Sequence, residues 1–213
     1  AYQDEIEVAF GWKSSSSGTN GEMDLIGEVR GSRSISLDLL PSRLDLGRGN
    51  WQNDRTVHLE IDSNRVQIDS LVMQNSDQRL AVDGTISPDP GDPLAFILDQ
   101  VELENFAPFL GGPKFEGTLN GSGQFFDLYK APIVRSDLQV DSVVIDGHEI
   151  GNVHLSAGWT QGQRAVELQG HVDRDGVKAL DFNASNRRFL ADLVRKLATP
   201  SERALTAQEE RAI

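Results

Sequence analysis

The sequence predicts an all-β fold, in which short strands form one long, curled antiparallel sheet, followed by a short helical tail at the C-terminus. Apolar and polar residues alternate in short runs, and most runs end at glycine, proline, asparagine, aspartate or serine. Strands therefore arrive about every 8 to 12 residues, which is the spacing typical of antiparallel sheets. No helical periodicity interrupts these runs before Phe182.

The first half of the chain shows this plan of strands and turns most plainly. Residues 1–12 alternate with one apolar face, and the polar residues 14–21 then predict a loop. Residues 57–68 form two alternating runs joined by a polar turn, which indicates a hairpin. Three prolines within residues 87–93 end a later strand, because proline cannot donate a hydrogen bond to a sheet.

Glycines recur between alternating apolar positions and give the chain a loose internal repeat. The pattern appears in residues 80–86, 115–121 and 166–172, at unequal intervals. It predicts a long meander, in which each strand needs its neighbours to cover its apolar face. A single sheet of this length must twist, and glycines inside strands relieve crowding where the sheet bends. We therefore expect the sheet to curl with its apolar face inward.

The end of the chain departs from this plan. Phe189, Leu193 and Leu197 recur at helical intervals, with charged residues on the remaining surface. Residues 199–202 then have the form of a helix start, with threonine as the N-cap, proline at the first helical position and glutamate completing a capping box. We expect two short helices. The domain prediction is thus a curled β region at residues 1–182 and a helical tail at residues 183–213.

Composition excludes several classes of partner and chemistry. The 213 residues have a net charge of −13, which argues against a nucleic-acid partner because clustered lysine and arginine are needed to neutralise phosphates. The same charge disfavours simple electrostatic docking on anionic lipid. The absence of cysteine removes disulfides, zinc–thiolate sites and thiol catalysis. No apolar run approaches the roughly 20 residues of a membrane-spanning helix, and the start at Ala1 suggests a mature form or a piece of a longer chain.

Candidate chemical groups are few. The four histidines alternate with apolar residues, so we expect their side chains to project away from the apolar face into solvent. They are His58, His148, His154 and His171. Asp89 and Asp92 lack the further acidic ligands of a calcium loop, so a proline-rich turn is the simpler explanation. The glycines at 117–123 are not followed by a phosphate-binding lysine. We expect no catalytic residue, no metal site and no cofactor.

The repeating plan is most complete in residues 97–145. The apolar segment Leu-Glu-Asn-Phe-Ala-Pro-Phe-Leu at 103–110 precedes Glu-Gly-Thr-Leu-Asn-Gly at 116–121, and Ala-Pro follows at 131–132. In the order of these segments, residues 51–182 resemble the C-terminal repeat region of TamB-type, AsmA-like proteins of the Gram-negative envelope.

The resemblance implies a non-enzymatic periplasmic protein that is anchored to the inner membrane in its full-length form. It implies an open, β-taco-like trough whose apolar lining carries the acyl chains of phospholipid between the inner and outer membranes. A role in outer-membrane protein assembly, beside a barrel protein of the Omp85 kind, is implied as well. In such a family the strands would continue where this chain has its helical tail.

The apolar face allows two interpretations. Alternation alone favours a sandwich core that is closed by a second sheet, whereas the resemblance favours an open groove that binds lipid. The predicted lining residues are the same in both cases. They are Val57, Leu59, Ile61, Val66, Ile68, Leu80, Val82, Leu138, Val140, Val153, Leu155, Val166 and Leu168.

The sequence also allows functions of other classes. An extracellular β-sandwich or solenoid adhesion module would bind protein or glycan through loops such as residues 14–21. A β-helix hydrolase would need paired carboxylates facing one groove. The acidic residues are spread too evenly along the chain to nominate such a pair.

Overall fold

A computed structural model describes most of the chain as a single antiparallel β-sheet. The described residues are 4–13, 19–30, 34–45, 49–89, 91–106, 113–126, 133–160 and 165–184. The prediction of an all-β fold built on one large antiparallel sheet is confirmed. The predicted helices at 183–213 lie outside the described residues, except that the last strand continues to Ala184.

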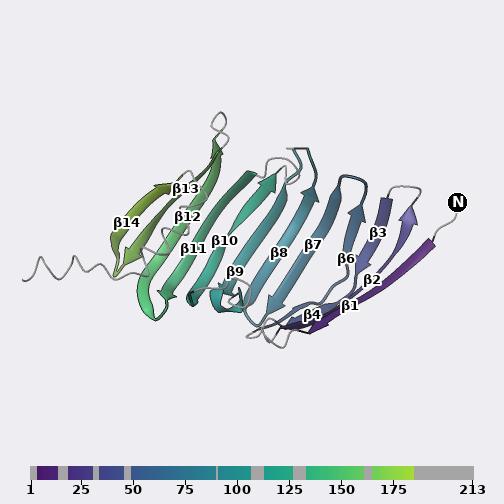
Figure 1. The fold of residues 1–213 in the computed structure, drawn as a ribbon, viewed down its shortest axis with the longest axis horizontal. Coiled ribbons are helices and arrows are strands. Elements are labelled where there is room, and N and C mark those ends of the chain that lie inside the picture. The colour runs from purple at the N-terminus through teal and green to yellow at the C-terminus, as the bar shows by residue number, and fades with distance from the viewer. Residues whose placement is uncertain are drawn as a thin grey trace, which may run out of the picture.

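Fourteen strands and one short 3-10 helix make up the described part. Figure 1 shows the labelled strands lying side by side in one sheet. The elements in chain order are β1 (Asp4–Lys13), β2 (Asn20–Arg30), β3 (Ser34–Leu39), β4 (Ser42–Asp45), β5 (Asn50–Asn53), β6 (Val57–Ile61), β7 (Val66–Asn75), β8 (Gln78–Ile86), β9 (Leu94–Glu102), η1 (Leu103–Phe106), β10 (Phe115–Phe126), β11 (Ile133–Ile145), β12 (His148–Thr160), β13 (Ala165–Arg174) and β14 (Val177–Ala184).

The strands follow one another through the sheet as a meander. From β7 to β13 every strand pairs with the strands before and after it in the sequence, and β14 pairs with β13. The apparent crossovers near the N-terminus come from two interrupted strands, because β2 pairs with both β3 and β4 along its length, and β7 pairs with both β6 and β5. β3 and β4 are therefore one long strand broken at Pro41, and β5 and β6 are a second one. The predicted hairpin at residues 57–68 is formed by β6 and β7.

Side-chain hydrogen bonds hold the break between β3 and β4 in place. Pro41 has no N–H to donate to the ladder, so the break occurs where the backbone loses a donor. Asn53 replaces the missing ladder bonds, since its Oδ1 accepts from the Ser42 backbone N–H at 2.8 Å and its Nδ2 donates to the Arg55 carbonyl at 2.8 Å. Asn53 is only 2% exposed. Backbone groups at the break are thus hydrogen-bonded by the Asn53 side chain, and the break is a regular part of the sheet.

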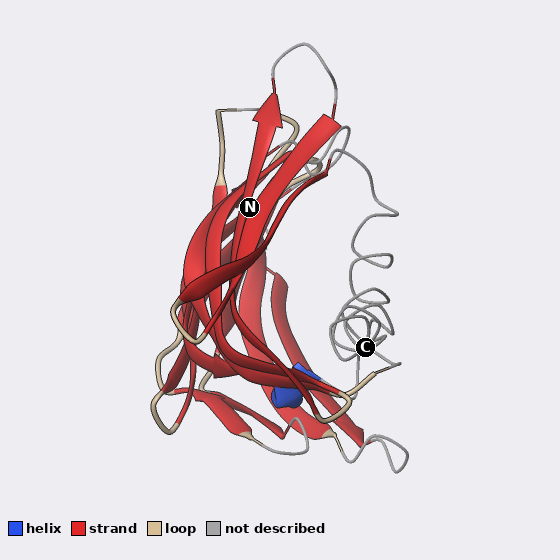
Figure 2. Cartoon of the chain, turned by 90° about the vertical axis from the view of Figure 1, so that its left-hand side faces the viewer, coloured by secondary structure: helices blue, strands red, loops and turns tan. Residues whose placement is uncertain are grey.

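No second sheet covers the described strands. The substantial contacts between strands join hydrogen-bonded neighbours within the one sheet. Figure 2 shows that this sheet is bent into a curve, with η1 lying on its concave side. The sandwich interpretation of the apolar pattern is therefore wrong for the part of the chain that the structure describes.

The register assigns apolar and polar side chains to opposite faces of the sheet. Residues directly opposite each other in an antiparallel pair share a face. Leu119 lies opposite both Val101 and Val140, and Val140 lies opposite Val153, so one apolar row crosses four strands. Leu103 of η1 packs against the cluster that contains Val140. Because η1 lies on the concave side, the apolar face is the concave one.

Three bulges with the same design recur at alternate strands. In each, two residues oppose a single Asp or Asn on the next strand, and the second of the two has a positive φ near 50°. The side-chain oxygen of that Asp or Asn accepts the backbone N–H of the positive-φ residue at 2.8–2.9 Å. The pairs are Ser70 with Asp83, Gln100 with Asn120, and Ser142 with Asn152. Since a bulge bends and twists its strand, these repeats explain where the sheet curves.

Candidate functional site

The concave face is the main candidate site, because it gathers most apolar side chains of the sheet onto one surface. It has two packed clusters. One is centred on Val140, Val153 and Val172 near the C-terminal strands, and the other on Trp51 and Met73 near the middle of the sheet. Leu119 contacts both clusters and joins them. The apolar surface is therefore continuous from Trp51 on β5 to Val172 on β13.

The register brings the predicted lining residues together on this face. Val57, Val140 and Val153 are buried. Nine others are half-buried on the same face: Leu59, Ile61, Val66, Ile68, Leu80, Val82, Leu138, Leu155 and Leu168. For Val166 the structure describes the backbone pairing with Trp159, and its side chain lies outside the described part. Whether lipid contacts these residues stays a prediction.

Several residues of this face cannot be predicted from alternation, because the bulges shift the alternation by one. Leu71 and Met73 follow the bulge at Ser70, and Val101 follows the one at Gln100. They share the concave face with residues of the opposite sequence parity, such as Ile68. The sequence signal is an aspartate, then serine or glutamine, then an apolar residue, at 69–71, 99–101 and 141–143.

Aromatic rings lie over glycines on the concave face. A Cβ built on Gly123 would meet the Phe96 ring at 2.5 Å, and one built on Gly170 would meet the Phe182 ring at 2.5 Å. Phe96 also lies 5.3 Å from the ring centre of Phe125. Two of the glycines that interrupt the alternating runs therefore leave room for rings to lie flat against the sheet.

One margin of the concave face is closed by η1 and by a buried polar group. Val101 and Asn105 are completely buried there. Asn105 Nδ2 donates to Gln78 Oε1 at 2.6 Å, and the same oxygen accepts the Glu102 backbone N–H at 3.0 Å. The concave face thus has a firmly packed margin, while Val8, Phe10 and Leu180 near its two ends are exposed.

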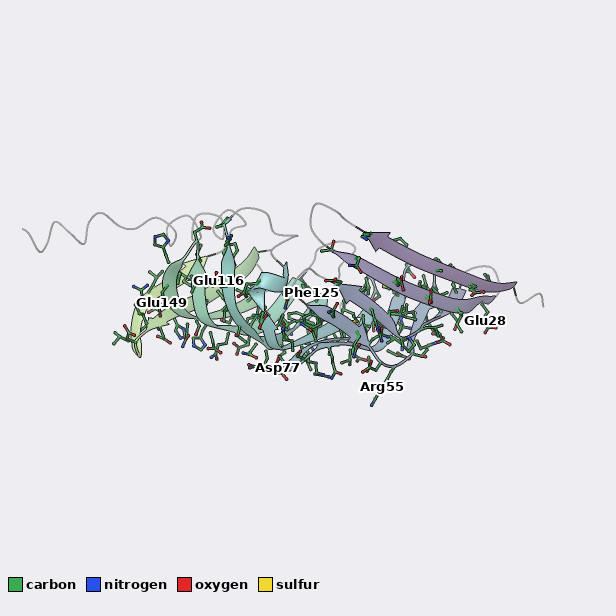
Figure 3. All side chains as sticks on the ribbon, turned by 90° about the horizontal axis from the view of Figure 1, so that it is seen from below. Glu28, Arg55, Asp77, Glu116, Phe125 and Glu149 are labelled. Carbon is green, nitrogen blue, oxygen red and sulfur yellow. The ribbon has the colours of Figure 1, made fainter. Side chains whose placement is uncertain are left out.

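The convex face is polar and acidic. The strand residues that alternate with the apolar ones place carboxylates there. Figure 3 shows that the Arg55 side chain also projects away from this side of the sheet. The carboxylates include Asp38, Glu60, Asp83, Asp99, Glu116 and Asp137. In an acidic chain this face raises the local concentration of cations.

The histidines lie as predicted with respect to the apolar face, but two of them meet. His58, His154 and His171 are on the convex face, and His148 is exposed at the start of β12. His58 Nδ1 lies 2.8 Å from Asp38 Oδ1, and this hydrogen bond raises the pKa of His58. The rings of His154 and His171 stack with their centres 4.5 Å apart, beside Asp173. The alternating pattern of the sequence does not predict this second group.

Comparisons with protein-family models, with curated proteins and with solved structures return no match for this chain. In the part that the structure describes, no helix combines the length and apolar character needed to cross a membrane. The family resemblance of the sequence, its periplasmic location and its non-enzymatic character therefore stay predictions.

Proposed function

We propose that this protein is a non-enzymatic, AsmA-like, TamB-type component of the cell envelope whose concave face binds phospholipid acyl chains. The sheet forms an open, β-taco-like trough, and lipid moves along it between the inner and outer membranes. The observation that supports this most directly is the apolar face of a single sheet, which no other described strand covers. In a protein that worked only as a folded scaffold, such a face would be covered by a second layer.

The dimensions of the face suit an extended apolar ligand. With β3–β4 and β5–β6 each counted as one strand, neighbouring strands about 4.8 Å apart give a path of roughly 50 Å across the sheet. Each methylene of an acyl chain that leaves water for this surface contributes about 0.8 kcal/mol. A chain of ordinary length would therefore be held strongly, while the open side lets it enter and leave without unfolding the sheet.

The charge distribution favours acyl chains over headgroups as the part that the face recognises. The concave lining is aliphatic and aromatic, whereas the acidic side chains are on the convex face. An anionic headgroup therefore gains little from contact with the sheet and stays in water at the open side. The concave face would therefore select lipids by their acyl chains and not by their headgroups.

The ends of the sheet suit a module within a longer conduit. Among the described strands, β1 pairs only with β2 and β14 only with β13. An unpaired strand edge is a template for another strand. Further repeats of the same chain, or an outer-membrane barrel protein of the Omp85 kind, would extend the trough by pairing there. Through such strand pairing the protein would take part in outer-membrane protein assembly.

Site-specific photocrosslinking in cells tests the proposal with residues one position apart on opposite faces. Probes at Leu59 and Leu138 on the concave face should crosslink to phospholipid, and matched probes at Glu60 and Gln139 on the convex face should not. Crosslinks of all four probes to protein alone would instead favour an adhesion or binding module. Equal lipid labelling on both faces would also count against the trough.

A further inference from the structure

We propose that His154, His171 and Asp173 form a binding site for a divalent transition-metal ion, Zn²⁺ above all, on the convex face. His154 on β12 lies directly opposite His171 on β13, and Asp173 follows two residues later on β13. Side chains two residues apart on a strand share a face. The sheet therefore brings one donor from one strand and two from its neighbour to a single point.

The distances between the three donor atoms are close to those between the ligands of one metal ion. The Nε2 atoms of His171 and His154 lie 3.3 and 3.8 Å from the same carboxylate oxygen, Asp173 Oδ2. All three donor atoms are within 4.8 Å of one another. In a tetrahedral site with bonds of about 2.0–2.1 Å, neighbouring ligand atoms are roughly 3.3 Å apart. The two rings stack with an interplanar angle of 17°, so they must turn out of the stack for both nitrogens to point at one ion.

A metal ion would give the three donor groups one common partner. One carboxylate oxygen faces two imidazole nitrogens, and the two rings stack with their centres 4.5 Å apart. A divalent ion between the three groups is bound by both neutral rings and by the carboxylate at once. It converts two competing contacts into one shared site.

The surroundings allow an ion to enter and to keep water ligands. The side chains of His154, His171 and Asp173 are 33–35% exposed. A polar hollow beside the two rings is lined by Asp137, Ser156, Gln169, Asp181 and Asn183, among others. Two imidazoles and one carboxylate suit zinc better than calcium or magnesium, which prefer oxygen ligands. Three protein ligands with open positions fit a site that completes its coordination with water.

The ion would fasten β12 to β13 close to the C-terminal edge of the described sheet. β14 is the last described strand, and its residues from Val177 to Asp181 are exposed. A bridge between β12 and β13 holds the strand on which β14 pairs. Metal binding thus stiffens the edge of the sheet, whatever the concave face binds.

Calorimetric titration of the untagged 213-residue chain with Zn²⁺, after removal of metals by a chelator, tests this site. One Zn²⁺ should bind per chain, and His154→Gln, His171→Gln and Asp173→Asn should each weaken binding roughly tenfold or more. His58→Gln is the matched control and should bind Zn²⁺ as the parent does. The two ring nitrogens of His58 face different carboxylates, Asp38 and Glu60, and so cannot form one chelate.

Nitrogen NMR of the histidine rings gives a second readout that needs no substitution. The Nε2 resonances of His154 and His171 should move on addition of one equivalent of Zn²⁺, and that of His58 should not. The proposal is overturned if the parent chain binds no Zn²⁺ at millimolar concentration. It is equally overturned if those two resonances stay in place, or if the folded His154→Gln/His171→Gln variant binds Zn²⁺ undiminished.

Discussion

The concave and convex faces are built from the same strands, yet they differ in what surrounds their side chains. On the concave face, apolar residues such as Leu59 and Leu155 are half-buried, and no second layer of described strands covers them. On the convex face, polar residues such as Asp38 and His58 pair with each other in solvent. An alternating pattern therefore shows that a sheet has two different faces, and it does not show that the apolar one is covered.

Within the concave face a second contrast matters for function. The margin near η1 is fully packed, with Val101 at 0% and Val140 at 7% exposure. Val82 and Leu168, elsewhere on the face, stay half-buried. We expect the packed margin to hold the sheet in shape and the half-buried positions to meet the ligand. Charge substitutions separate these two roles.

The largest effect is expected for a charge at the packed margin. Val140→Asp places an unpaired carboxylate in the buried cluster with Val153 and Val172, and should lower the free energy of unfolding by about 3–5 kcal/mol. Urea denaturation measures this loss. Gln124→Asp is the matched control, because Gln124 is exposed on the convex face opposite Arg135, and its effect should stay within about 0.5 kcal/mol. Similar losses in both variants would contradict the assignment of faces.

A charge at the half-buried positions should affect lipid binding more than stability. Val82→Asp and Leu168→Asp leave a carboxylate that can stay hydrated at the open side of the trough, so both proteins should remain folded by circular dichroism. The same carboxylate opposes acyl chains, so lipid crosslinking from a probe at Leu59 should fall strongly. Unfolding of both variants would mean that this part of the face is a closed core, and the lipid proposal would then be dropped.

The bulges offer a smaller and more local test. Asn152→Ala removes the oxygen that accepts the Ser142 N–H at 2.9 Å, and should cost about 1 kcal/mol. The positive φ of Ser142 is itself unfavourable for a residue with a Cβ, by about 1–2 kcal/mol. Adding Ser142→Gly should therefore restore much of the lost stability in urea denaturation. An Asn152→Ala variant as stable as the parent would show that the hydrogen bond does not hold the bulge. A double variant less stable than Asn152→Ala would show that the positive φ of Ser142 is not a source of strain.

Alternation alone was enough to predict the strands and the composition of the apolar face, because side-chain parity on an uninterrupted strand needs no tertiary information. It failed after Ser70, Gln100 and Ser142, where an extra residue reverses the parity and only the register of the partner strand reveals it. Alternation also could not distinguish an uncovered apolar face from a sandwich core, since both give the same alternation of apolar and polar residues along each strand.

The histidine group was missed for a related reason. His154 and His171 are 17 positions apart, so they meet only if the hairpin register of β12 and β13 places them opposite each other. The spacing of His171 and Asp173 was the one local hint, since residues two apart on a strand share a face. A motif of ligands at fixed spacing along one segment does not detect donors that are arranged across two strands.

The smallest expected effect concerns His58 on the convex face, where partly exposed charges contribute little. The hydrogen bond to Asp38, with Asp69 and Glu60 nearby, raises the pKa of His58 in the folded state above its usual 6.5. The stabilisation is therefore complete below about pH 6.5 and is lost as the pH rises through the folded pKa. Solvent screening limits it to about 0.2–1 kcal/mol. The parent should lose this amount between pH 5.5 and pH 8 relative to His58→Gln, measured as a difference of urea midpoints. An equal pH dependence of both proteins would show that the His58–Asp38 contact does not contribute to stability.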